Sequence, residues 1–216
     1  KTTLFSKFKN FYKNHRLEFF IYFSSLAAQL IYFLIVIFKF GAGQEPFQAI
    51  NKNDTDEYIK LGTNLFYHFK YSLIKYGDAF WPEPVRPPLY PLFIAGFYAL
   101  SRQFWFVILA QNLLLALAPV LAYKIGTAVF NKRIALLAAL LLVFESERVA
   151  MASTFLSDAF FSFLFLASVY FYLKMEKNIS AGLKYAFWAA FFLGLATVAR
   201  PIGIIVLGPY FLITFG

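Results

Sequence analysis

The chain has 216 residues, of which 61% are hydrophobic and 14% are charged, and its formal net charge is +9. A soluble domain has about half apolar and about a quarter charged residues, so this composition excludes an ordinary soluble protein. We interpret the positive charge as basic residues that flank membrane helices, and we expect no nucleic-acid partner. The chain has no cysteine, which excludes disulfide and thiolate chemistry.

Long runs with almost no charge predict membrane-spanning helices. A bilayer core of about 30 Å needs about 20 apolar residues per helix. The longest such runs are 19–38, 104–123, 134–144 and 159–173. We therefore predict an all-α polytopic membrane protein with about five to six transmembrane helices. The chain opens without Met and stops inside an apolar run, and we expect it to be the amino-terminal part of a longer protein.

The distribution of charge predicts the orientation. Residues 1–16 form a basic arm, which we expect to be cytoplasmic, and 17–40 form the first transmembrane helix. Residues 41–103, where acids and bases roughly balance, then become an external loop that carries the catalytic residues. The rest, 104–216, holds the remaining transmembrane helices. We expect the protein in a plasma or inner membrane, with its active site on the external side.

Residues 87–100 decide the topology after that loop. They are apolar but too short to span comfortably, so we place them along the outer interface. Lys132 and Arg133, and the basic segment 174–184, then fall inside; the alternative, in which 87–100 cross, puts Lys132 and Arg133 outside. The later helices are predicted at 104–130, 134–150, 155–173 and 185–198, with a sixth after Pro201.

The stretch "NKNDTDEY" at 51–58 starts an amphipathic helix that we expect to lie in the membrane interface. Asp54 or Thr55 is the expected N-cap, and Asp56 and Glu57 are expected first-turn acids that favour the helix dipole. Asp54 is left open as a cap, a base or a metal ligand. The apolar face consists of Tyr58, Leu61, Leu65, Phe69 and Leu73.

A proline-rich strap follows at 80–91 and contains Arg86. Proline fixes φ and disfavours regular helix, so the strap should hold Arg86 in a defined place. The alternative is a simple interfacial stop between helices. The prolines are Pro82, Pro84, Pro87, Pro88 and Pro91.

Further charged residues lie at predicted helix ends. Ionisable groups near membrane depth are costly, so each is a functional candidate. Arg148 is either functional or paired with Glu145 or Glu147, and Asp158 either acts chemically or caps its helix. Arg200 precedes a proline and has the fork of donors that suits a phosphate. Neither histidine, His15 or His68, is expected to be a ligand, and we predict no metal site from the motifs.

Four motifs occur in a familiar order: "DTDEYIKLGTNL" at 54–65, "RPPLYPLFIA" at 86–95, "LSDAFF" at 156–161 and "GLATVARPIG" at 194–203. With this order and spacing, the chain resembles the integral-membrane GT-C glycosyltransferases. It is most similar to the protein mannosyltransferase and lipid A aminoarabinose transferase branch, which takes its sugar from a polyprenyl-phosphate carrier. The resemblance covers nearly the whole chain and the amino-terminal half of the usual family length.

The resemblance implies roles for individual residues. Asp54 matches the catalytic Asp of the first external loop, and Asp158 stands where a Glu is more usual. Arg86 matches a position that implies either binding of the donor phosphate or organisation of the loop. Arg200 matches the Arg or Lys of the family's "RP" turn, and we expect it at the donor phosphate as well. Gly62 stands where the family usually has Ala. Supporting roles are expected for Asp56, Glu57, Tyr58 and Arg148, although Asp56 matches no fixed family position.

The implied reaction is inverting transfer of a sugar to a protein or lipid acceptor, with an Asp as base. Some related enzymes use a divalent cation, Mg²⁺ or Mn²⁺, and others do not, so no cofactor is assigned. Two alternatives come from other classes: a transporter or flippase of lipid-linked sugar, and a purely structural membrane subunit. Transporters often have internal repeats, and this sequence shows none.

Overall fold

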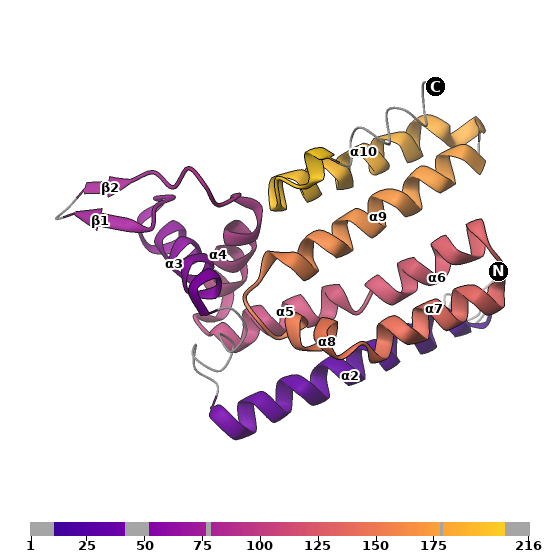
Figure 1. Cartoon of the computed structure of the whole chain (residues 1–216), viewed down its shortest axis with the longest axis horizontal. Helices are drawn as coiled ribbons and strands as arrows, with labels where there is room; N and C mark the ends of the chain where they lie inside the picture. The colour runs from indigo at the N-terminus through magenta and orange to yellow at the C-terminus, as the bar shows by residue number, and fades with distance from the viewer. Residues whose placement is uncertain (1–10, 42–51, 77–78, 178, 206–216) are drawn as a thin grey trace, which may run out of the picture.

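The computed structural model describes residues 11–41, 52–76, 79–177 and 179–205. The regular secondary structure in these residues is helical apart from one short hairpin (Figure 1). Four segments within them are long and apolar enough to cross a membrane. The predicted class, an all-α integral membrane protein, is confirmed, with fewer spans than the five to six expected. The spans are α2 (Arg16–Phe40), the α5–α6 segment (Phe104–Val129), α9 (Ser157–Lys177) and α10 (Gly182–Ala199).

The predicted helix at 134–150 is wrong as a single helix, which lowers the count. The segment divides into α7 (Lys132–Phe144) and α8 (Ser146–Ala152) at Glu145, whose backbone is extended. The Glu145 carboxylate accepts hydrogen bonds from the backbone N–H groups of Glu147 and Arg148, at 3.0 and 2.8 Å, and so caps α8. The rest of the predicted sixth helix, beyond residue 205, lies outside the described residues.

The second span is also interrupted. It consists of α5 (Phe104–Leu115) and α6 (Ala118–Val129), separated by a turn at Ala116 and Leu117. Pro119 lies at the start of α6. Since proline has no N–H, it cannot continue the ladder of hydrogen bonds from α5, and it is tolerated in the first turn of a new helix.

The segment between the first two spans contains α3 (Lys52–His68), strands β1 (Ile74–Tyr76) and β2 (Ala79–Trp81), and α4 (Leu89–Ser101). The strands are antiparallel, with Ile74 opposite Trp81. The apolar pattern predicted a longer helix, but α3 ends at His68. Phe69 takes a left-handed φ of 54° and is 90% exposed, so neither Phe69 nor Leu73 continues the buried face.

Two further expectations for this segment are corrected. Asp54 was expected before the helix, but α3 begins at Lys52 and places Asp54 within its first turn. The strap was expected to exclude helix as far as Pro91, but α4 begins at Leu89. Pro91 occupies the first turn of α4, where a missing N–H costs no intrahelical bond.

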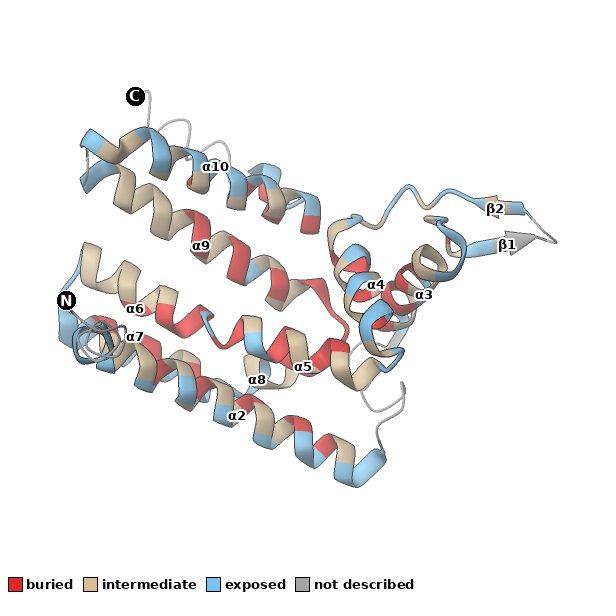
Figure 2. Cartoon of the chain, turned by 180° about the vertical axis from the view of Figure 1, so that it is seen from behind, coloured by how far each residue is buried: buried red, intermediate tan, exposed pale blue. Residues whose placement is uncertain are grey.

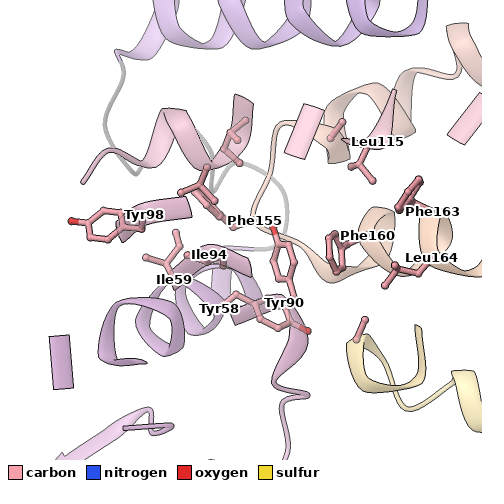
Figure 3. Packing of buried hydrophobic residues seen from close by; sticks show 14 of the residues in the cluster. Tyr58, Ile59, Tyr90, Ile94, Tyr98, Leu115, Phe155, Phe160, Phe163 and Leu164 are labelled. Atoms are coloured by element: carbon pink, nitrogen blue, oxygen red, sulfur yellow. The ribbon is translucent and has the colours of Figure 1, made fainter. Parts of the chain in front are cut away.

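Apolar packing fixes α3 and α4 against the start of α9 (Figure 3). Tyr90 and Phe155 are fully buried. The Tyr90 ring meets the Tyr58 ring edge to face at 5.2 Å between centroids, and it lies 5.7 Å from the Phe160 ring. Because three helices share this cluster, residues on α3 and α9 have fixed relative positions.

Buried and exposed residues alternate along α2 (Figure 2), and its large exposed side chains are apolar. Ser25 and Gln29 are fully buried between helices. This arrangement is the one expected of a helix in lipid, where polar groups must find partners within the protein. The large exposed apolar side chains of α2 include Phe20, Phe23, Ile31, Leu34, Ile35 and Phe38.

Candidate active site

Arg86 lies between two carboxylates of α3. Its Nε donates to Glu57 Oε2 at 2.6 Å. Its Nη2 lies 2.6 Å from the same Glu57 oxygen and donates to Asp54 Oδ1. The guanidinium carbon lies 5.5 Å from the centre of the Tyr58 ring. Partial burial lowers the pKa of Arg86, but the hydrogen bonds to Glu57 and Asp54 outweigh it and raise that pKa above its ordinary value. The guanidinium therefore stays charged at any physiological pH.

The strap is held in place by hydrogen bonds of its own. The Glu83 carboxylate accepts from the backbone N–H groups of Val85 and Arg86, at 2.8 and 3.2 Å. The Tyr71 hydroxyl donates to the Arg86 carbonyl at 2.5 Å. Burial and the nearby Glu83 raise the pKa of Tyr71 above its ordinary value, so the phenol remains a neutral donor. These contacts fix the backbone from which the Arg86 side chain reaches α3.

A second ion pair joins Arg200, just after α10, to Asp158 in the first turn of α9. The Arg200 side chain is 37% exposed and that of Asp158 is 44% exposed. Asp158 therefore has an ionic partner from another helix and is more than the cap of its own helix. The pair lies at the same end of the bundle as α3 and α4 (Figure 1).

One hydrogen bond connects the two ion-pair groups. The first group is Arg86 with Asp54 and Glu57, and the second is Arg200 with Asp158. The Tyr58 and Ser157 hydroxyl oxygens are 2.8 Å apart, and both side chains are buried. Tyr58 follows Glu57 in α3, and Ser157 precedes Asp158 in α9. The structure thus brings together Asp54, Glu57, Arg86, Asp158 and Arg200, which come from four separate stretches of the sequence.

A cavity of 300 Å³ lies next to Asp158, between α7–α8 and α9. Glu145, Glu147 and Arg148 line it together with Asp158 and an apolar wall that includes Leu115 and Leu166. A lining that combines charged and apolar side chains is typical of a site for an amphipathic ligand.

Arg148 is held by oxygen atoms of neighbouring helices. Its Nε donates to the Leu142 carbonyl at 2.6 Å, and its Nη2 donates to the Ser25 hydroxyl at 3.2 Å. With its amide oriented to satisfy both neighbours, Gln29 accepts from Arg148 Nη1 at 2.8 Å and donates to the Asn112 carbonyl at 2.8 Å. Among the described residues no ion pair forms between Arg148 and Glu145 or Glu147, so the alternative of a direct pairing is wrong.

Glu57, for which a supporting role was expected, contacts Arg86. The sequence analysis missed Gln111. Gln111, buried in α5, accepts from the Tyr90 hydroxyl at 2.6 Å and donates to the carbonyls of Ala152 and Thr154, at 3.0 and 2.9 Å. It holds the turn that precedes α9. A polar residue inside an apolar run signals such a partner, because lipid offers none.

The described residues include no group of three or more His, Cys, Asp or Glu side chains that could hold a metal ion. Asp54 and Glu57 are neighbours, but the Arg86 guanidinium contacts both. His15 bonds to Glu18 at 3.1 Å, and His68 lies against the Phe80 ring.

Comparison with known families gives one match. The sequence model of a family described as dolichyl-phosphate-mannose-protein mannosyltransferase matches residues 85–215. The matched region begins one residue before Arg86 and contains Asp158 and Arg200, whereas Asp54 and Glu57 precede it. No curated protein and no solved structure matches the chain.

Proposed function

The chain belongs to the dolichyl-phosphate-mannose-protein mannosyltransferase family, and we propose that it transfers a sugar, with inversion, from a polyprenyl-phosphate donor to a protein or lipid acceptor. Membership supports the glycosyltransferase class, the type of donor and the membrane setting. We assign the reaction to the end of the bundle that carries the two ion-pair groups. The observation that carries this assignment is the link from Asp54 and Arg86 through Tyr58 and Ser157 to Asp158.

Asp54 is our candidate for the base. In the proposed step the acceptor hydroxyl oxygen attacks the anomeric carbon, and Asp54 takes the hydroxyl proton. The bond from the anomeric carbon to the phosphate oxygen breaks, and its electron pair leaves with the polyprenyl phosphate. A phosphate needs no proton to leave, so one carboxylate is sufficient. Arg86 donates to the Asp54 carboxylate and so fixes its orientation.

Arg86 and Arg200 are our candidates for stabilising the leaving phosphate. A guanidinium has five N–H donors, and the Arg86 contacts with Glu57 and Asp54 are made by Nε and Nη2. We assign Arg86 Nη1 to the donor phosphate. Arg200 is more exposed than Arg86, and we propose that it exchanges part of its contact with Asp158 for the phosphate.

Asp158 has two proposed roles in this scheme. It holds Arg200 before the donor binds, and it lines the 300 Å³ cavity together with Arg148 and Glu147. We propose that this cavity takes the apolar part of the donor close to the phosphate. Glu57, Tyr58 and Arg148 then act as positioning residues, and we assign no contact with the reacting atoms to Asp56.

The test is transfer by purified protein supplied with a labelled polyprenyl-phosphate sugar. Asp54→Asn should slow release of free polyprenyl phosphate by about 10²- to 10⁴-fold, the usual contribution of a general base. Glu176→Gln, which makes the equivalent change at an exposed residue of the opposite end, should leave the rate unchanged. Retained turnover in Asp54→Asn would remove Asp54 from the role of base.

The same assay addresses the transporter alternative. A flippase would move the labelled donor across a vesicle membrane without releasing free polyprenyl phosphate, with or without an acceptor. An enzyme should release it when an acceptor is added. Protein and lipid acceptors, supplied separately, distinguish the two acceptor classes. We further propose that the amino terminus is cytoplasmic and that the site faces the external side of a plasma or inner membrane.

A further inference from the structure

A large basic cavity lies at the end of the bundle opposite the candidate active site, where the start of α2, the α6–α7 junction and the end of α9 meet (Figure 1). Its volume is 610 Å³. Neither the ion-pair groups nor the proposed transfer reaction uses it. We call it the basic cavity; the charged residues that line it are Lys13, Arg16, Glu18, Lys124, Lys132, Lys174 and Lys177.

The charges in this cavity are unbalanced. Six of the lining residues are basic and one is acidic. That acid, Glu18, already contacts Lys124 at 3.2 Å and His15 at 3.1 Å. The Lys177 ammonium donates to the Ala128 carbonyl at 2.8 Å, which holds it between α9 and α6. Basic groups from four elements converge on one space, and a positive potential in a concave site attracts an anion.

An apolar groove adjoins the basic cavity. It has a volume of 450 Å³ and shares Glu18 and Lys124 with the cavity. The rest of its lining is almost wholly apolar and comes from the first turns at 11–22 and from the α5–α6 segment. The groove residues are Phe11, His15, Phe19, Tyr22, Leu117 and Val120. The basic cavity and the apolar groove therefore meet at the ion pair between Lys124 and Glu18.

We propose that the basic cavity and the apolar groove together bind one anionic phospholipid of the surrounding bilayer. The phosphate group would lie among Lys13, Lys132 and Lys174, and an acyl chain would lie along Phe19 and Leu117. The depth is appropriate, because Arg16 begins a membrane-spanning helix and so lies near the headgroup layer. Basic pockets between membrane helices recognise anionic headgroups through the same chemistry.

A lipid bound in the basic cavity would connect several helices and stabilise the folded bundle. The cavity lining comes from α2, α6, α7 and α9, so a bound headgroup bridges helices that are distant in sequence. A ligand that binds only the folded state stabilises that state by mass action. This inference does not depend on the proposed reaction, and its test requires no sugar donor.

The test measures lipid binding to the purified protein in a neutral detergent by native mass spectrometry and by the thermal unfolding midpoint. Dioleoyl phosphatidylglycerol should bind and raise the midpoint, whereas dioleoyl phosphatidylcholine should bind at least tenfold more weakly. The variant Lys13→Gln/Lys132→Gln/Lys174→Gln should lose tenfold or more in affinity for phosphatidylglycerol. The control Lys60→Gln/Arg133→Gln/Lys184→Gln removes the same charge at exposed residues outside the lining and should bind like the unmodified protein.

Two further arms identify the source of the phosphate. Phe11→Ser changes a half-exposed residue of the groove. It should weaken the binding of phosphatidylglycerol without changing the binding of inorganic phosphate. Inorganic phosphate alone should bind far more weakly than the lipid. The proposal is overturned if phosphatidylcholine binds as tightly as phosphatidylglycerol, or if the control variant loses as much affinity as the cavity variant. It is also overturned if inorganic phosphate binds as tightly as phosphatidylglycerol. Circular dichroism verifies that each variant is folded.

Discussion

The Tyr58 hydroxyl oxygen lies 2.8 Å from the Ser157 hydroxyl oxygen, and this buried contact joins the helix that bears Asp54 to the helix that bears Asp158. The two residues are 99 positions apart in the sequence. Edge-to-face packing of Tyr58 on Tyr90 holds the phenol at that position. The bond therefore sets the distance between two carboxylates that the proposed reaction uses.

Tyr58→Phe and Ser157→Ala should each slow transfer, because each removes this contact between α3 and α9. A buried hydrogen bond contributes about 1 kcal/mol, so we expect roughly a fivefold loss for each variant. The double variant should be no slower than either single one, since both remove the same bond.

Tyr67→Phe is a matched control for the comparison of the Tyr58 and Ser157 variants. Tyr67 also belongs to α3, but its hydroxyl contacts Tyr98 at 3.3 Å and its side chain is largely exposed. Its transfer rate should stay near that of the unmodified protein. Additive effects of Tyr58→Phe and Ser157→Ala would show that the contact does not couple the two helices.

Arg86→Lys should lower kcat/KM by at least tenfold, a loss of about 1.4 kcal/mol in the transition state. Lysine keeps the charge, but its single ammonium cannot reproduce the planar fork that contacts Glu57 and Asp54 at the same time. Steady-state kinetics with the labelled donor measures the loss. Arg102→Lys is the control, because Arg102 lies over the Phe66 ring, away from both carboxylates; equal losses in the two variants would contradict the assignment.

The sequence predicts the local parts of this site better than their partners. The apolar run of α2 and the motif that contains Arg86 are local, and both were identified from composition and spacing. Glu57 was expected only in a supporting role, and its contact with Arg86 was not predicted, because Asp54 was placed outside the helix. Because α3 begins at Lys52, both Asp54 and Glu57 lie within the helix, and their spacing of three positions places them on one helix face. Two carboxylates on one face are a predictable site for one cation.

Other features that the sequence analysis did not predict have different physical causes. The β1–β2 hairpin had a signal, because Gly77 and Asp78 separate two short strands with a high content of aromatic and β-branched residues. The contact between Arg148 and Ser25 spans 123 positions, and no local pattern encodes it. The break at Glu145 results from a cap that competes with continuous helix, and the apolar content alone does not show it.

Gly62→Ala should destabilise the packing of α3 on α4. A Cβ at Gly62 would lie 2.6 Å from Ile94 Cγ2 and 3.3 Å from the Pro91 carbonyl oxygen, so the helices must separate. Overpacking of this kind costs about 1–3 kcal/mol, and the thermal unfolding midpoint should fall. Gly96→Ala in α4 is the matched control, because its Cβ meets nothing within 4 Å. That variant should be neutral or slightly more stable, since Ala favours helix.

The proposed orientation can be tested with single cysteines, because the chain contains none. Val85, in the strap beside Arg86, is 73% exposed, and Arg133 is exposed at the opposite end of the bundle. If the site faces outward, a membrane-impermeant maleimide should label Val85→Cys in intact cells and should label Arg133→Cys only after the membrane is opened.

The two variants control for each other, because each residue reports one end of the same bundle. The bundle contains spans of about 27–39 Å, at 1.5 Å per residue for 18 to 26 residues, so the two ends lie on opposite sides of a bilayer core of about 30 Å. Labelling of Arg133→Cys alone in intact cells would reverse the orientation and would place the candidate active site in the cytoplasm. Equal labelling of both positions would contradict a membrane-spanning bundle with separated ends.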